Sequence, residues 1–507
     1  MGSRRRKRSV TEMLGSRSSG LSDAGALLRL NLKILRAVIL QDHRTFTRVW
    51  SKTSKSTISY EDGRIYFENF RSCYSSIHSE PQIQYMLPKC SKLEKIENAL
   101  LCQSPLDKAL PNPSDHKPCL LALTADNWLY RLAAQTGDVL QKIYLSPHFK
   151  FRYIGWDVPQ ETFYLKSTQN KGTPLAGQSG LNQGTLMHLA IFHVFPLEIV
   201  GILEITKEVF GNSVTDAVLA QGVLCVSHSN KSVKLYSCEH ILKKYMTTKL
   251  TLGEQSSFSG GNRVGNVPLG IPVNIHFNDC PPVLFEVSCS SYSVQIGGCP
   301  WHYIYTPPHK KHKGTHHICS LEDSILATNG IQEMNRCSLE DDWIFFHHDD
   351  SGRIIHFGPS TINVLKILKG LKSGMPCEVV VDFSIAAHRD VSVDSQVVVT
   401  SSGRTVKRRA QQLDDDPDQE TFRLVEYEDE LDLLAVVVTD SEEGEAKAHV
   451  RLFDNKSGDL LKTVPLAGCW DETYCHGVFI DRETIIHIGQ KNNNYSCNVY
   501  KLQNSRK

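Results

Sequence analysis

Short runs of alternating apolar and polar residues recur along the chain, separated by clusters of Asn, Ser, Gly and Asp. The clearest case runs from Arg451 to Val464, where Leu452-Phe453 and Leu460-Leu461 flank Asn455-Lys-Ser-Gly-Asp459. Alternation with a period of two predicts half-buried strands, and a glycine that can take positive φ permits a tight connection between them. The pattern predicts a β-hairpin.

The same pattern recurs at five other places. It is clear at 129–140 and 344–356, and weaker at 397–406, 60–66 and 224–233. Many short strands with regular turns are typical of a β-sandwich, a barrel or a propeller. The strand-rich region covers about 440 residues, whereas sandwiches and barrels usually end near ~250. We therefore predict an all-β, diverged WD-repeat-like β-propeller of about seven blades, since a WD-type blade takes about 40 to 45 residues.

An amphipathic helix is predicted from Ser22 or Asp23 to about Leu40, because apolar residues recur there at helical spacing. One apolar face consists of Leu28, Leu32, Leu35 and Ile39. The helix either packs beneath the propeller or offers a face to a groove in a partner. The segment 45–50 is a candidate extension of it. The predicted organisation is a disordered basic tail (1–21), a helical arm (22–55) and a propeller with loop insertions (56–503).

Three smaller expectations concern the region between the predicted strands. Residues 88–101 predict a short helix, because Ser91 and Glu94 have capping-box spacing. Residues 166–185 and 253–270 are rich in Gly, Ser and Asn, and we expect them to be loops between blades. The apolar run 186–205 is long enough for a membrane span, but Pro196 and the His and Glu residues in it favour two buried strands. Membrane association is therefore a minor alternative.

The net charge of +1 conceals a strong asymmetry. Residues 1–55 hold 13 Lys and Arg against 3 Asp and Glu, whereas residues 414–445 hold 14 acidic residues and one basic residue. The basic end includes an unbroken run, Arg4, Arg5, Arg6, Lys7 and Arg8, which is typical of a nuclear or nucleolar targeting signal or of a phosphate-binding patch. The alternative is a solvated tail. Fifteen cysteines without a Cys-x-x-Cys pair argue for reduced thiols, in the cytosol or nucleus.

Candidate catalytic and metal chemistry is sparse. His309, His312, His316, His317 and Cys319 are close in sequence, but interleaved lysines disfavour a dication there and no cysteine pair completes a zinc site. We interpret the segment as an exposed basic hairpin tip. The sequence has no Walker loop, no G-x-G-x-x-G motif after a predicted strand, no His-Glu-x-x-His and no G-x-S-x-G elbow. We predict no cofactor, no metal and no enzymatic activity.

Trp-Asp pairs occur at Trp156-Asp157 and Trp470-Asp471. Read as plain structure, each places an aromatic side chain between blades and an Asp that bonds a turn amide. The alternative is a docking role, and it depends on a resemblance to a known family.

Several longer stretches carry that resemblance. They are Pro88-Lys-Cys-Ser-Lys-Leu-Glu-Lys-Ile-Glu97, Lys150-Phe-Arg-Tyr-Ile-Gly-Trp-Asp-Val-Pro-Gln-Glu161, Gly298-Cys-Pro-Trp-His-Tyr-Ile304, Asn329-Gly-Ile-Gln-Glu-Met334 with Ser351-Gly-Arg-Ile-Ile-His356, and Asp414-Asp-Asp-Pro-Asp-Gln-Glu-Thr-Phe422 with Glu428-Asp-Glu-Leu-Asp-Leu-Leu434. From about residue 30 to 502 the chain resembles the vertebrate factors associated with the damage-specific DNA-binding protein adaptor and cullin-4.

The resemblance implies a non-catalytic substrate receptor that docks on this adaptor and recruits other proteins for ubiquitination by a cullin-4 RING ligase. It also implies a nuclear, often nucleolar, location. Members often carry a W-D-x-R motif at a blade end and an apolar helix that enters the adaptor. Here Pro159 stands where Arg would complete Trp156-Asp157, and Thr473 where it would complete Trp470-Asp471. The adaptor-binding candidates are Leu28, Leu32, Leu35 and Ile39, then Trp156 and Asp157.

Two further function classes remain open from the sequence. A nuclear or nucleolar scaffold would bind nucleic acid through the basic tail and the Lys310–Lys313 loop, although aromatic residues for base stacking are not interleaved with these basic residues. A hydrolytic propeller enzyme is the weaker alternative. The identity of protein substrates is not encoded in any motif.

Overall fold

The structure is a computed structural model of the 507-residue chain. It describes residues 24–53, 58–61, 64–67, 72–75, 80–91, 94–102, 118–157, 162–172, 184–255, 262–288, 294–307, 315–333, 343–349, 351–370, 375–388, 396–399, 405–408, 419–442, 445–471, 475–491, 494–501 and 503–506. The basic run Arg4 to Arg8, the lysines 310–313 and the acidic residues 414–418 lie outside these ranges.

The chain divides into two compact units. The larger comprises Met1–Val287, Glu428–Asp432 and Thr473–Lys507, and the smaller comprises Ser288–Tyr427 and Leu433–Glu472.

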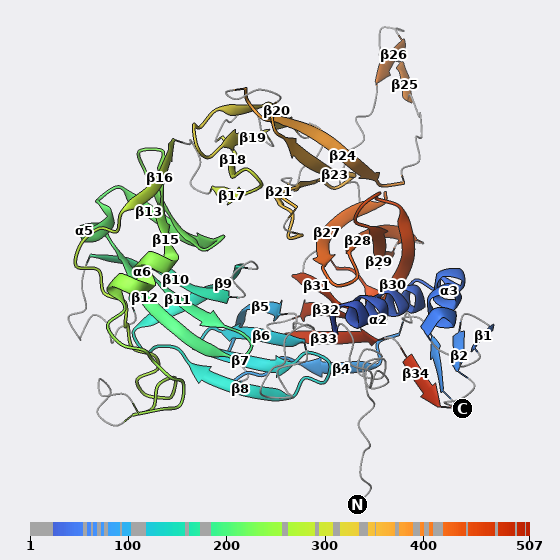
Figure 1. The fold of residues 1–507 in the computed structure, drawn as a ribbon, viewed down its shortest axis with the longest axis horizontal. Helices are drawn as coiled ribbons and strands as arrows, with labels where there is room; N and C mark the ends of the chain where they lie inside the picture. The colour runs from blue at the N-terminus through green and yellow to red at the C-terminus, as the bar shows by residue number, and fades with distance from the viewer. Residues whose placement is uncertain are drawn as a thin grey trace, which may run out of the picture. The chain divides into compact units, whose positions relative to one another are not determined.

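Three sheets of the larger unit are built from four strands in chain order. They consist of β5 (Ile96–Cys102), β6 (Cys119–Thr124), β7 (Trp128–Ala133) and β8 (Val139–Tyr144); of β9 (Phe149–Asp157), β10 (Thr162–Gly172), β11 (Thr185–His193) and β12 (Glu198–Thr206); and of β13 (Val214–Ala220), β14 (Val223–His228), β15 (Ser232–Ser237) and β16 (Val283–Ser288). Figure 1 shows them as successive ribbons. The short helices α5 (Lys207–Phe210) and α6 (Cys238–Tyr245) accompany the third sheet.

A fourth sheet of the larger unit joins distant parts of the chain. The strands β31 (His476–Asp481), β32 (Thr484–Lys491) and β33 (Asn494–Lys501) come from the C-terminal end, whereas β4 (Ile83–Met86) comes from near the N-terminal end. β4 pairs antiparallel with β33, with Ile83 opposite Val499 and Met86 opposite Ser496. A strand from near the N-terminal end therefore completes a sheet of three C-terminal strands.

The smaller unit contains three more sheets of four strands. They are β17 (Gln295–Gly297), β18 (His302–Tyr305), β19 (Thr315–Ser320) and β20 (Leu326–Glu333); β21 (Trp343–Phe346), β22 (Ile354–Phe357), β23 (Thr361–Leu368) and β24 (Glu378–Ala386); and β27 (Thr421–Glu428), β28 (Leu433–Glu442), β29 (Glu445–Asp454) and β30 (Leu460–Cys469). A single parallel pair, Thr328 with Glu378, joins the first two into one eight-stranded sheet. The hairpin β25 (Gln396–Val399) and β26 (Thr405–Arg408) is inserted before β27.

These meanders are the blades of a β-propeller fold, and seven of them fall within the described residues, which confirms the predicted fold class. One further sheet consists of β1 (Ile58–Glu61), β2 (Arg64–Phe67), β3 (Ser72–Ser75) and the last strand, β34 (Gln503–Arg506). Its β1–β2 hairpin was predicted, whereas the pairing of β3 with β34 was not. The cores lie between consecutive sheets, as where Phe163 and Phe192 stack at 5.0 Å between ring centroids among buried Leu and Ile side chains. Burial of such apolar surface stabilises by about 25 cal/mol per Å².

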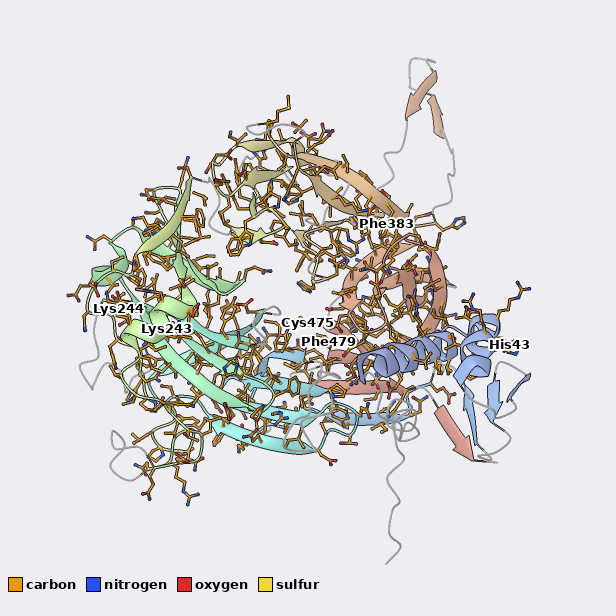
Figure 2. The ribbon with its side chains drawn as sticks, viewed as in Figure 1. His43, Lys243, Lys244, Phe383, Cys475 and Phe479 are labelled. Carbon is orange, nitrogen blue, oxygen red and sulfur yellow. The ribbon has the colours of Figure 1, made fainter. Side chains whose placement is uncertain are left out.

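All six predicted hairpins are pairs of adjacent strands. Two of their turns are equivalent. Gly137 lies between β7 and β8 with φ 75°, and Gly458 lies between β29 and β30 with φ 74°, so each joins the third and fourth strands of a blade. Each glycine also packs on an aromatic side chain of a neighbouring blade's fourth strand. Gly137 packs on Tyr85 of β4, and Gly458 packs on Phe383 of β24, which is labelled in Figure 2. These two turns are true repeats.

Several local predictions need correction. Residues 96–102 form the strand β5 rather than a helix, although one of the two capping-box hydrogen bonds forms. Ser91 Oγ accepts from the Glu94 N–H at 3.1 Å, while the Glu94 carboxylate accepts from the N–H of Cys90, one residue before Ser91. The pairing of β5 with β6 and the burial of Ile96, Leu101 and Cys102 outweigh the local helix signal. The segments 166–185 and 253–270 connect strands of one sheet instead of joining blades, and residues 166–172 belong to β10.

The apolar run 186–205 forms β11 and β12, as predicted from its composition. Among the described residues, no helix is long and apolar enough to cross a membrane. The described cysteines carry no disulfide.

Candidate functional site

The predicted helical arm consists of two helices, α2 (Ala24–Ile39) and α3 (His43–Thr53), which contact each other (Figure 1). α3 does not extend α2, as residues 45–50 had suggested, because Gln41 takes φ 57° and Asp42 starts a new helix. The Asp42 carboxylate accepts a hydrogen bond from the Thr45 N–H at 3.0 Å, which is the geometry of a helix N-cap. The arm is therefore a helical hairpin.

The apolar face of α2 is largely covered by the chain itself. Leu35 and Ile39 are 0% and 1% exposed, Leu32 is half-buried, and the side chain of Leu28 lies outside the description. α2 also contacts β3. The C-terminal half of the predicted docking face thus packs internally, and among the described side chains of this face Leu32 keeps accessible surface.

Asp157 holds the end of β9 to the next blade. Its two carboxylate oxygens accept from the N–H groups of Gln221 and Gly222, both at 2.9 Å, in the turn between β13 and β14. Burial raises the pKa of Asp157, and the hydrogen bonds from Gly222 and Gln221 act in the opposite direction. Trp156 is half-buried against the adjoining core. The pair thus shows the structural arrangement expected of a Trp-Asp at a strand end.

Glu428 repeats this arrangement at the end of β27. Its Oε1 accepts from the Arg482 N–H at 3.1 Å, in the turn between β31 and β32, and its Oε2 accepts from the Leu431 N–H at 2.7 Å. In both blades a carboxylate at the end of the first strand fixes the first turn of another sheet. Trp470 is also buried and Asp471 is exposed. The sequence did not distinguish Glu428 from the other acidic residues around it.

A second buried network occupies the smaller unit around Arg353. Its guanidinium donates to Asp382 at 3.2 Å and to the Asn455 carbonyl oxygen at 2.8 Å, and it also pairs with Asp349. Although burial acts to raise the pKa of Asp349, hydrogen bonds from His347, Ser351 and Arg353 hold that pKa well below its ordinary value. Charges that are paired and hydrogen-bonded in this way stabilise local structure and are not poised for proton transfer.

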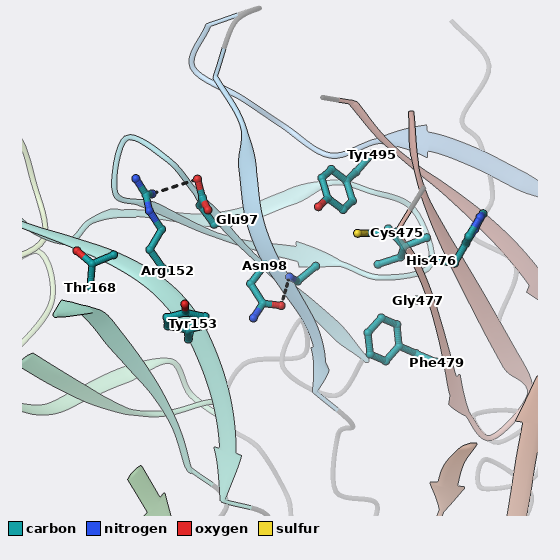
Figure 3. Close-up of a pocket in the computed structure, with 12 residues that line it drawn as sticks. Glu97, Asn98, Arg152, Tyr153, Thr168, Cys475, His476, Gly477, Phe479 and Tyr495 are labelled. Carbon is teal, nitrogen blue, oxygen red and sulfur yellow. Dashed lines mark hydrogen bonds and ion pairs between the residues drawn. The ribbon is translucent and has the colours of Figure 1, made fainter. Parts of the chain in front are cut away.

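A pocket of about 520 Å³ opens beside β5, β9 and β31 of the larger unit (Figure 3). Arg152 and Glu97 form an ion pair of 3.2 Å on one wall, and the exposed ring of Tyr153 lies nearby. The opposite wall carries Phe479 and His476. The charges on Arg152 and Glu97 compensate each other, so the lining is mixed aromatic and polar without strong net charge.

The two histidines beside this pocket interact directly. His476 Nδ1 lies 3.1 Å from His487 Nε2, and the rings stack at 5.3 Å between centroids. Burial and the neighbouring His476 lower the pKa of His487 to about 4. His487, which lies behind His476 and does not line the pocket, is therefore neutral at physiological pH.

The histidine cluster considered for zinc falls partly outside the description, because His309 and His312 are not described. His316 and Cys319 lie buried on β19, and His317 bonds Tyr305 at 3.1 Å. Within the described ranges, the group of side chains suited to a metal ion is instead Glu428, Asp429 and Glu430.

Comparison with known proteins gives a consistent result. The sequence pattern of the family DDB1- and CUL4-associated factor 17 matches residues 30–502. The DDB1- and CUL4-associated factor 17 of Danio rerio is 58% identical over 496 residues, covering 97% of this chain and 94% of that protein. Its counterparts in Mus musculus and Homo sapiens are each 51% identical, covering 98% of this chain and 97% and 96% of theirs.

Among solved structures, the Cps50 (Swd1) β-propeller domain of Myceliophteria thermophila aligns with a TM-score of 0.40 and 8% identity, covering 81% of this chain and 100% of that one. The fold assignment rests on the strand pairing and not on this likeness.

Proposed function

The chain belongs to the DDB1- and CUL4-associated factor 17 family, and on that premise we propose that it is a non-catalytic substrate receptor of a cullin-4 RING ubiquitin ligase. In this role it associates with DDB1 and cullin-4 and recruits other proteins for ubiquitination. The observation that carries the proposal is identity of 51 to 58% to relatives bearing this name over nearly the whole of both chains.

The fold supports a binding role in a physical sense. Blades of four strands hold their connecting turns rigidly, and rigid turns provide wide surfaces that recognise partners without a catalytic group. The match begins at residue 30, inside α2, so the similarity includes the helical arm as well as the blades.

We place the DDB1 contact on the helical arm. Asp157 is a weaker candidate because both of its carboxylate oxygens already accept backbone hydrogen bonds within the chain. On α2, the half-buried Leu32 combines an apolar side chain with accessible surface, and Lys33 is exposed next to it. His43 and Arg44, at the start of α3, are also exposed (His43 is labelled in Figure 2). An apolar side chain surrounded by polar groups is a common arrangement at a protein interface.

Co-purification from cells tests the proposal. Tagged full-length chain is expected to recover DDB1 and cullin-4, and the Leu32→Glu variant is expected to lose most of both. Leu460→Glu is the matched control, because Leu460 is 53% exposed on β30 and receives the same change. Thermal unfolding of each variant shows that it is folded. Recovery of neither protein by the wild-type chain would contradict the proposed function.

The pocket beside β5, β9 and β31 is our proposed site for a substrate segment. Its volume and its mixture of aromatic and polar groups suit a few side chains of an extended peptide. Tyr153→Ala is expected to reduce ubiquitination of bound substrates while recovery of DDB1 stays unchanged. Equal loss of substrate ubiquitination and of DDB1 recovery would instead indicate that Tyr153 is needed for the blade to fold.

A nuclear location is part of the same proposal. The run of five basic residues from Arg4 to Arg8 supports it, because such clusters are typical of nuclear targeting. Replacing the five residues with alanine is expected to shift the tagged chain to the cytoplasm in fluorescence images. An unchanged distribution would assign targeting to another segment.

A further inference from the structure

A lysine amine is held over two aromatic rings on strands β7 and β8. Tyr130 of β7 lies opposite Lys142 of β8, and Trp128 is two residues before Tyr130, so these three side chains share one face of the sheet. Lys142 Nζ lies 3.9 Å from the centre of the Trp128 ring and 5.4 Å from that of Tyr130. These cation–π contacts hold the amine in place on an exposed side chain.

The thiol of Cys90, in the segment between β4 and β5, reaches the same amine. Cys90 Sγ lies 3.2 Å from Lys142 Nζ and 3.2 Å from Tyr130 Oη. Burial raises the pKa of the Tyr130 hydroxyl, so this group keeps its proton and donates to the sulfur. Cys90 is exposed, so small molecules in solution reach the thiol. Thiols that react with oxidants typically have such electropositive and accessible surroundings.

The backbone around Cys90 is also fixed. Glu94 is 4% exposed, and its carboxylate accepts a hydrogen bond from the Cys90 N–H. Ser91 Oγ in turn accepts from the Glu94 N–H at 3.1 Å. The sulfur and the amine are thus held from both sides at 3.2 Å, which is within the range of about 3 to 3.5 Å at which two positioned atoms react.

We propose that hydrogen peroxide oxidises Cys90 and that Lys142 captures the product, which joins the two side chains by a sulfur–nitrogen bond. The thiolate sulfur attacks one peroxide oxygen and the O–O bond breaks. The leaving oxygen takes a proton from the Lys142 ammonium and departs as water. Cys90 is then a sulfenic acid, and Lys142 is a neutral amine.

The second step is a condensation of the kind that sulfenic acids undergo with nearby nitrogen atoms. The Lys142 amine attacks the Cys90 sulfur, the S–O bond breaks, and the hydroxyl leaves with one amine proton as a second water. The sulfur has lost two electrons, and the peroxide has gained them. The product is a sulfenamide.

The bond would close the loop between residues 90 and 142 and tie the segment after β4 to β8. A crosslink of this kind restricts the unfolded chain and therefore raises the melting temperature. Added thiol reduces the bond and releases both side chains. The stability of this part of the larger unit would then depend on the oxidation state of the thiol.

Cys280 provides a comparison within the same unit. It is also exposed, and its Sγ lies 3.8 Å from a tyrosine hydroxyl, Tyr236 Oη. Within the part of the chain that the structure describes, the hydrogen-bond partner of this sulfur is that tyrosine and not a lysine amine. Peroxide is expected to oxidise Cys280 without forming a crosslink.

Peroxide treatment of the purified full-length chain, followed by proteolysis and mass spectrometry, tests the bond. The wild-type chain is expected to give a peptide pair joined through Cys90 and Lys142, lighter than the two separate peptides by about 2 Da and lost on treatment with dithiothreitol. Lys142→Arg keeps the positive charge beside Trp128 but lacks the amine. This variant should give no crosslink, and dimedone, which labels sulfenic acids, should label its Cys90 more than that of the wild type.

Cys280→Ser is the matched control, and it is expected to form the crosslink as the wild type does. Thermal unfolding shows that each variant is folded, and the oxidised wild type should melt at a higher temperature than oxidised Lys142→Arg. Absence of the crosslinked pair from the peroxide-treated wild type would overturn the proposal. So would equal dimedone labelling of Cys90 in the wild type and in Lys142→Arg.

Discussion

Replacement of Gly458 by alanine tests whether the turn between β29 and β30 is a repeated blade contact. Gly458 has φ 74°, and a Cβ added there would collide with the Phe383 ring, lying 2.9 Å from Cε2 and 3.2 Å from Cγ. Left-handed backbone costs an L-residue about 1 to 2 kcal/mol. Overpacking against the ring adds about 1 to 3 kcal/mol. We therefore expect Gly458→Ala to lower the free energy of unfolding by about 2 to 5 kcal/mol.

Gly468→Ala separates the two contributions. Gly468 lies on β30 with φ 89°, and a Cβ added there would meet no atom within 4 Å. This variant should show the backbone cost alone, about 1 to 2 kcal/mol. Because both glycines belong to the smaller unit, urea unfolding of the full chain, followed by proteolysis of that unit, compares them directly.

A double-mutant cycle then tests whether the remaining cost of Gly458→Ala comes from the Phe383 ring. In the Phe383→Ala background the ring is absent, so Gly458→Ala should cost no more than Gly468→Ala, with a coupling energy of about 1 to 3 kcal/mol. The reasoning fails if Gly458→Ala and Gly468→Ala have the same cost in the wild-type background. It also fails if the cycle is additive within about 0.5 kcal/mol.

Three further predictions follow from the same contacts. Asp157→Asn leaves one backbone N–H without its carboxylate partner, so the free energy of unfolding from denaturant titration should fall by about 1 to 3 kcal/mol. DDB1 should still be recovered at low temperature. Loss of DDB1 recovery without loss of stability would restore Asp157 as a docking residue. Leu35→Ala removes a fully buried side chain and should cost about 2 to 5 kcal/mol in thermal or urea unfolding, whereas a cost under about 1 kcal/mol would show that α2 is not packed. Burial raises the pKa of Glu428 to about 7 and that of Asp481 to about 6, so the folded chain retains protons that the unfolded chain releases. The free energy of unfolding should therefore fall as pH rises from about 4 to 7. Asp481→Asn should flatten the decline of melting temperature with pH, and a decline parallel to that of the wild type would contradict the assignment.

The sequence predicted the hairpins and the fold class because both depend on local patterns. The alternation of apolar and polar residues and the glycine turn of a hairpin both lie within about fifteen residues of sequence. Every predicted hairpin is formed. The turns do not, however, share one place in the blades: Gly352 joins first and second strands, whereas Gly137 and Gly458 join third and fourth strands. The pattern therefore identified hairpins, but it did not show which two strands of a blade each hairpin joins.

What the sequence missed depends on pairings across long separations. β4 reads as an ordinary short strand, and nothing local indicates that it joins β33 more than 400 residues later. Asp481 likewise reads as a single acidic residue, and its proximity to Glu428 appears only when the last blade is assembled. The helix predicted at 88–101 failed because the capping pair is real but serves a turn before a buried strand.

Direct binding of the purified full-length chain to purified DDB1 tests the central claim. Biolayer interferometry is expected to show saturable binding by the wild-type chain, at least tenfold weaker binding by Leu32→Glu, and unchanged binding by Leu460→Glu. A tenfold change corresponds to about 1.4 kcal/mol, which is within the range of a single interface contact. No measurable binding of the folded wild-type chain to DDB1 would contradict the account.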